Sequence, residues 1–156
     1  MGRGVPRDLV GDNVPADGGY ASRLRQCGGA RGLAHYVHFL GFVDPPWGVL
    51  AEGTVGVAPN KLPEPFGKAL IEMMSAQRPV VAAAAGGVLE ILGSGSEGVQ
   101  FELGSPESLR SALEQVLDLT PQAAHEMGVR SRSRALRFAE ADTAREWADF
   151  LTEGRP

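Results

Sequence analysis

The stretch LPEPFGKALIEMMSAQRPVVAAAAGGVLEIL, residues 62–92, decides the fold of this chain. Residues 66–76 carry an apolar stripe at helical spacing. Residues 79–83 form a short apolar run bounded by turn residues, which is typical of a buried strand. The pair Gly86-Gly87 follows, and a second short helix is expected to open near Val88. The stretch therefore predicts a helix–strand–helix unit, with a helix stripe made of Phe66, Ala69, Leu70, Met73 and Met74.

Helix and strand patterns alternate along most of the remaining sequence. We expect strands at residues 7–10, 36–42, 54–58, 79–83 and 99–103, and helices at residues 20–27, 45–52, 66–76, from 88, 106–117, 121–138 and 143–151. Such alternation predicts an α/β fold, a Rossmann-like parallel sheet with helices on both faces. Sheets of this kind bind ligands at the carboxyl ends of their strands.

Size and charge restrict the class of protein. A chain of 156 residues suits one domain, and a net charge of −4 argues against a nucleic-acid partner bound by phosphate neutralisation. The sequence has no run of 18 uncharged apolar residues and no signal-peptide pattern, so we expect a cytoplasmic location. Its single cysteine, Cys27, has no obvious basic partner and is expected to be an inert thiol.

Two glutamates border the predicted helix at residues 66–76. Glu64 precedes the helix and Glu72 lies inside it. Helical side chains tilt toward the N-terminus, so both carboxylates are expected to border one pocket. The free backbone N–H groups of a helix start suit an anionic or hydroxyl-rich ligand. Gly67 would let that ligand approach the backbone closely.

The Gly86-Gly87 turn repeats this arrangement after the next strand. Consecutive N–H groups in such a turn form an anion-binding concavity. The sequence thus predicts a crevice in which acids hold hydroxyl groups and glycine amides hold phosphate. The alternative, a solvated helix face beside an ordinary turn, stays open.

The segment EPFGKALIE, residues 64–72, resembles the E-x7-E motif of the retaining glycosyltransferases of group 1, also called family 4, which have the GT-B fold. The resemblance extends to the order of other segments. These are DLVGD at residues 8–12, YVHFLGFV at 36–43, GTVGVAPN at 53–60 and RPVVAAAAGGVLEIL at 78–92.

The resemblance implies a C-terminal donor domain that binds a UDP-, GDP- or ADP-linked sugar without a metal or other cofactor. Glu64 would lie beside the donor sugar as the catalytic glutamate, and Glu72 would hold the ribose hydroxyls. Three further groups would line the site: Phe66, Gly67 and Lys68 at the sugar or diphosphate, Gly86 and Gly87 in the same crevice, and Gly41, Phe42 and Val43 at the base.

The sequence also departs from the family pattern. Residues 1–156 are expected to be a single donor-binding domain, incomplete at the N-terminus, without its first strand and without the acceptor domain. That strand would lie between the strands at residues 7–10 and 54–58. We therefore expect a fragment that is inactive alone, with an acceptor domain or a second chain as partner. A non-catalytic nucleotide-sugar-binding or interaction module is the alternative, and a GT-B epimerase or phosphorylase relative is a weaker one.

Other polar clusters give weaker signals. His35, His38 and His125 lack the spacing and companions of a metal site. The arginines at positions 130, 132, 134 and 137 indicate a solvated helix face, with membrane-surface contact as the rival interpretation. Residues 147, 150 and 151 form an apolar stripe that fits either an interface or ordinary core.

Overall fold

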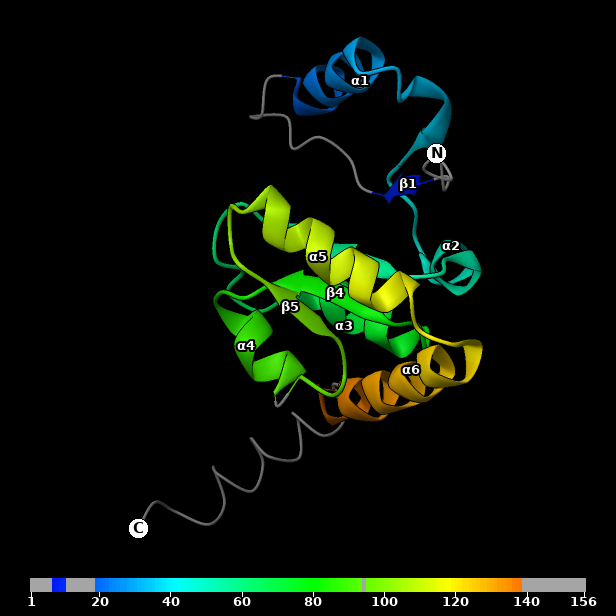
Figure 1. Cartoon of the computed structure of the whole chain (residues 1–156), viewed down its shortest axis with the longest axis vertical. Coiled ribbons are helices and arrows are strands. Elements are labelled where there is room, and N and C mark those ends of the chain that lie inside the picture. Colours follow the sequence, from blue (N-terminus) through cyan, green and yellow to red (C-terminus); the bar gives the residue numbers. More distant parts are fainter. Residues whose placement is uncertain (1–6, 11–18, 94, 139–156) are drawn as a thin grey trace. The chain divides into compact units, whose positions relative to one another are not determined.

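The computed structural model describes residues 7–10, 19–93 and 95–138 (Figure 1). The chain forms two compact units, Met1–Pro46 and Trp47–Pro156, and each is considered by itself. A single domain over residues 1–156 stays a prediction. The predicted helix at residues 143–151, with its apolar stripe, lies outside the described residues.

The first unit contains a two-stranded parallel sheet and a helix. Strand β1 (Arg7–Val10) pairs with β2 (Val37–Gly41), with Leu9 opposite Phe39. Helix α1 (Tyr20–Ala30) and a 3-10 helix (Ala34–Tyr36) lie between the two strands in the sequence. The predicted strand at residues 36–42 is thus one residue shorter at each end, and the predicted helix at residues 20–27 is longer.

The longer helix changes the surroundings of the cysteine. Cys27 is exposed on α1, and the guanidinium of Arg31, four residues later, donates a hydrogen bond to its Sγ. The expectation that Cys27 has no basic partner is therefore wrong. Residues at i and i+4 share one helix face, and that relation is missed when the helix is predicted to end at residue 27.

The second unit has a three-stranded parallel sheet in the order β3–β4–β5. The strands are β3 (Gly56–Ala58), β4 (Val80–Ala83) and β5 (Val99–Phe101), with Val81 opposite both Val57 and Val99. The helices are α2 (Trp47–Glu52), α3 (Lys68–Ser75), α4 (Gly87–Leu92), α5 (Pro106–Leu117) and α6 (Pro121–Ala135), which a 3-10 turn (Leu136–Phe138) extends. The predicted α/β class is confirmed.

Strand β4 is buried on both faces and divides the core in two. Val80 and Ala82 pack with Leu70, Met74 and other residues of α3, α4 and α6, whereas Val81 and Ala83 pack with α5. Figure 1 shows α5 over one face of this sheet and α3 and α6 over the other. Burying each such valine or leucine contributes about 1.5–3 kcal/mol. This packing confirms the predicted arrangement of helices on both faces of a parallel sheet.

The described strands form two separate sheets. Among them, β1 pairs with β2 alone and β3 pairs with β4 alone. That the family's first strand is missing from the chain, and would lie between β1 and β3, stays a prediction.

The start of α3 also differs from its prediction. The helix begins at Lys68 because Gly67 adopts a left-handed conformation with φ of 82°. Two members of the predicted stripe, Phe66 and Ala69, are exposed, and Phe66 precedes the helix.

Candidate functional site

A backbone bridge joins the two loops that the sequence predicted to meet. The loop after β3 and the loop after β4 form an isolated parallel β-bridge between Glu64 and Gly86. The N–H of Gly87 donates a hydrogen bond to the carbonyl oxygen of Glu64 at 2.7 Å. Because β3 ends at Ala58 and β4 at Ala83, this bridge lies at the carboxyl edge of the sheet, where α/β proteins bind ligands.

The two loops approach each other so closely at this bridge that both Gly86 and Gly87 must be glycine. A Cβ at Gly86 would lie 2.4 Å from the Glu64 carbonyl oxygen, and one at Gly87 would lie 2.8 Å from that of Pro65. Gly86 also has a φ of 60°. The Gly87 N–H thus already has an acceptor within the chain. The sequence had predicted that this N–H would be available to bind an anion.

The side chain of Glu64 is fixed by two donors. Its Oε2 accepts a hydrogen bond from Asn60 Nδ2 at 2.9 Å, and its Oε1 accepts one from the Gly67 N–H at 3.3 Å. The carboxylate is half-buried at the start of α3, where the helix dipole favours negative charge. Asn60 is absent from the predicted site. Its place directly after Pro59 at the end of the β3 segment was the available signal.

Gly67 is needed by the fold itself. Besides its positive φ, a Cβ at this position would lie 2.7 Å from Ile91 Cδ1. An aliphatic side chain therefore lies close to Gly67, and the approach of a ligand to its backbone stays a prediction. The first intrahelical bond of α3 runs from the Ile71 N–H to the Gly67 carbonyl, so the amides of residues 68–70 precede it. Phe66, beside them, is 60% exposed.

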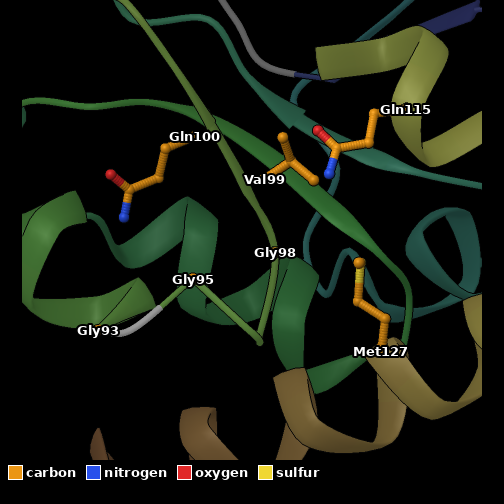
Figure 2. Close-up of a pocket in the computed structure, with 7 residues that line it drawn as sticks. All are labelled: Gly93, Gly95, Gly98, Val99, Gln100, Gln115 and Met127. Carbon is orange, nitrogen blue, oxygen red and sulfur yellow. The ribbon is translucent and has the colours of Figure 1, made fainter.

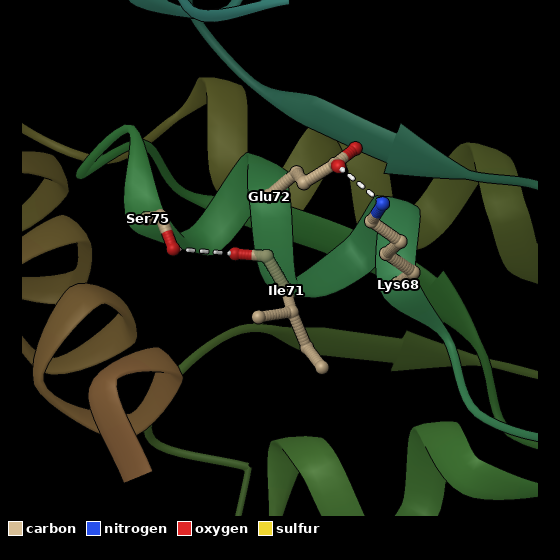
Figure 3. Close-up of polar contacts among 4 residues, drawn as sticks. All are labelled: Lys68, Ile71, Glu72 and Ser75. Atoms are coloured by element: carbon tan, nitrogen blue, oxygen red, sulfur yellow. Dashed lines mark hydrogen bonds and ion pairs between the residues drawn. The ribbon is translucent and has the colours of Figure 1, made fainter. Parts of the chain in front are cut away.

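Glu72 has a different partner from Glu64. Its Oε1 lies 3.8 Å from Lys68 Nζ, one turn nearer the start of α3 (Figure 3). The Lys68 side chain is 80% exposed and that of Glu72 is 27% exposed. An ion pair this open contributes only a few tenths of a kcal/mol, about 0.3–0.5. The Glu72 carboxylate thus lies beside the first turn of α3, in agreement with the predicted tilt.

The three residues predicted to border the base lie in the first unit. Gly41 ends β2 with a φ of 71°, Phe42 is 74% exposed, and Val43 follows. Their proximity to the base of a nucleotide stays a prediction.

Two hollows in the surface of the described residues lie away from these loops. One, of about 330 Å³, lies at the amino end of β5 and is lined by residues of β5, α5, α6 and the loop after α4: Gly93, Gly95, Gly98, Val99, Gln100, Gln115 and Met127 (Figure 2). Another, of about 420 Å³, lies in the first unit between α1 and β2. Neither glutamate lines either hollow, so the candidate site is defined by the loop contacts at the opposite edge of the sheet.

No group of three or more His, Cys, Asp or Glu side chains suited to a metal occurs within the described residues. Over the same part of the chain, no helix combines the length and apolarity needed to span a membrane.

Comparison with known proteins identifies the family of the chain. The family described as "Glycosyl transferases group 1" matches residues 8–119. EpsD of Bacillus subtilis is 30% identical over 121 residues, which cover 78% of this chain and 31% of EpsD. HepE of Anabaena in complex with UDP is 28% identical, with a TM-score of 0.88 over 96% of this chain and 41% of HepE.

A further solved structure extends the likeness. Sucrose-phosphate synthase of Thermosynechococcus elongatus is 25% identical, with a TM-score of 0.78 over 94% of this chain and 38% of the synthase. The chain therefore spans between 31% and 41% of the length of these proteins. By the family match and the shared GT-B architecture, the chain belongs to the group 1 glycosyl transferases, as a domain of their C-terminal type.

Proposed function

We propose that this chain binds a nucleotide-diphospho-sugar at the carboxyl edge of its second unit and supplies the donor half of a retaining glycosyl transfer. The observation that carries the proposal is the bridge between Glu64 and Gly86, which places the start of α3 next to the start of α4. Anionic groups are favoured at helix starts. HepE, the 28% identical relative, has been solved with UDP and with UDP-glucose, so a UDP-sugar is the first donor to test.

The proposed roles follow the partners of each side chain. Glu64, oriented by Asn60 and the Gly67 amide, lies beside the sugar. Glu72 accepts hydrogen bonds from the ribose hydroxyls, after exchanging its exposed contact with Lys68. The amides that follow Gly67 at the start of α3, beginning with that of Lys68, contact the sugar or the diphosphate beside Phe66. Gly86 and Gly87 supply the wall of the crevice.

The chemistry of glycosyl transfer suits a site of this kind. The diphosphate leaves as the sugar gains oxocarbenium character, so stabilising negative charge on the leaving group is the main catalytic need. Glu64 and Glu72 are not proposed as the acid and nucleophile of a hydrolase, in which two carboxylates flank the bond that breaks.

Calorimetry with UDP-glucose, and with GDP- and ADP-linked sugars, tests the proposal. Glu72→Ala removes hydrogen bonds between a charged acceptor and two hydroxyls, so we expect affinity to fall about ten- to hundredfold. Glu114→Ala is the matched control, because Glu114 pairs with Arg110 at the same i,i+4 spacing on α5. Equal affinities of wild type and Glu72→Ala would remove the ribose role.

A transfer assay on the chain alone tests the expectation that it is inactive by itself. Donor binding without release of UDP in the presence of sugar or lipid acceptors is the expected result, and release of UDP would contradict it. Absence of binding to all three donors would refute the nucleotide-sugar site itself.

A further inference from the structure

Two arginines of α6 bind the far ends of the two helices that begin at the candidate site. Arg132 donates from Nη1 to the carbonyl of Ser75, the last residue of α3, at 3.0 Å. Arg134 donates from Nε to the carbonyl of Ile91 at 2.9 Å and from Nη2 to that of Glu90 at 2.5 Å, both in the last turn of α4.

The chemistry of these contacts is that of helix C-caps. The last carbonyls of a helix have no intrahelical donor and carry partial negative charge, which a guanidinium satisfies. The fork of Arg134 binds two such carbonyls at once, and its Cζ lies 5.3 Å from the centre of the Phe138 ring. The arginine cluster is therefore not only a solvated face, because three of its members bind main-chain oxygens of other segments.

Close packing reinforces the link between α6 and α3. A Cβ at Gly128 would lie 2.3 Å from the carbonyl oxygen of Gln77, just beyond the end of α3. The buried face of α6 continues with Ser131 and Ala135, which are almost fully inaccessible to solvent. Helix α6 thus holds the C-terminal ends of α3 and α4 on a single rigid element.

The opposite ends of the same helices form the candidate site. Helix α3 starts after Gly67, whose N–H binds the Glu64 carboxylate. Helix α4 starts at Gly87, whose N–H binds the Glu64 carbonyl. A rotation of either helix at its rear end would therefore change the distance between the two helix starts.

We propose that Arg132 and Arg134 are positioning residues for the nucleotide-diphospho-sugar site. They act through α3 and α4 and do not touch the ligand. The identity of the ligand rests on the proposed function. The claim that α6 sets the distance between the starts of α3 and α4 can be measured without any ligand.

The test compares Arg134→Gln and Arg132→Gln with Arg130→Gln. Arg130 lies on the same helix and makes a similar bond, from Nε to the carbonyl of Ser96 at 3.0 Å, but Ser96 precedes β5 at the other edge of the sheet. Each variant is studied as the full chain by thermal unfolding, by amide chemical shifts of Gly67 and Gly87, and by UDP titration. Arg134→Lys keeps the charge but loses the fork.

We expect Arg134→Gln to shift the Gly67 and Gly87 resonances and to weaken UDP binding about two- to thirtyfold. Arg132→Gln should do the same to a smaller extent, Arg134→Lys should recover part of the loss, and Arg130→Gln should change neither measurement. The proposal is overturned if both resonances and the UDP affinity stay unchanged in Arg134→Gln and Arg132→Gln. If wild type binds none of the three nucleotide-sugar donors, the proposed function fails, and the two resonances alone decide the positioning role.

Discussion

Replacing Gly86 with alanine should destabilise the chain through a defined clash. The added Cβ would lie 2.4 Å from the Glu64 carbonyl oxygen and 3.0 Å from the Glu64 nitrogen. Both are backbone atoms of the bridge, so no side-chain rotation relieves the contact. Gly86 also has a φ of 60° and a ψ of −139°, a combination that alanine adopts only under strain.

The expected loss in the free energy of unfolding is the sum of two costs. Backbone strain costs about 1–3 kcal/mol, and forcing an atom into a closed contact costs about 1–3 kcal/mol more. The total of about 2–6 kcal/mol is a large share of the ~5–15 kcal/mol stability of a typical domain. At about 2–4 °C per kcal/mol for a chain of this size, Tm should fall by roughly 4–24 °C.

The assay is thermal unfolding followed by circular dichroism, with Gly104→Ala as control. Gly104 has a φ of 81° but nothing within 4 Å of an added Cβ, so alanine there meets the strain without the clash. Its cost should be about 1–2 kcal/mol. Equal losses of Tm in the two variants would refute the claim that the closeness of the bridge, rather than the glycine conformation, requires Gly86.

Three further substitutions test other parts of the structure by urea unfolding. Gly128→Ala places a Cβ 2.3 Å from the Gln77 carbonyl oxygen and should cost about 1–3 kcal/mol, whereas a neutral result would contradict the close approach of α6 to α3. Leu70→Ala removes a side chain that is 1% exposed and should cost about 2–5 kcal/mol, and a loss below ~1 kcal/mol would mean that this core is loosely packed. Ser105→Ala removes the N-cap bond accepted from the Ser108 N–H and should cost about 1 kcal/mol, with Ser105→Asp expected to retain most of it.

The sequence predicted the elements of the second unit because periodicity and turn residues agree there. Helix α5 occupies the predicted residues 106–117, and the buried run at residues 79–83 contains β4. The meeting of the Glu64 loop with the glycine pair also followed from the sequence, since parallel strands place their carboxyl ends at one edge.

What the sequence did not predict depends on tertiary contacts. The use of the Gly87 amide by Glu64, the contact of Gly67 with Ile91, and the binding of Ile91 by Arg134 all join residues 20 or more positions apart. No local pattern encodes such pairs. Likewise, the exposure of Phe66 follows from a helix start that the left-handed Gly67 delays.

The bridge between Glu64 and Gly86 is made only of main-chain atoms. The side chains around it can therefore change without removing the contact that holds the two loops together. Neighbouring positions such as Leu62, Phe66 and Leu89 are exposed and contribute no side-chain atom to it. Directed-evolution libraries that randomise those three positions would therefore alter the outline and polarity of the surface without dismantling its frame. The same arrangement allows related sequences to recognise different ligands while they keep the bridge between the two loops.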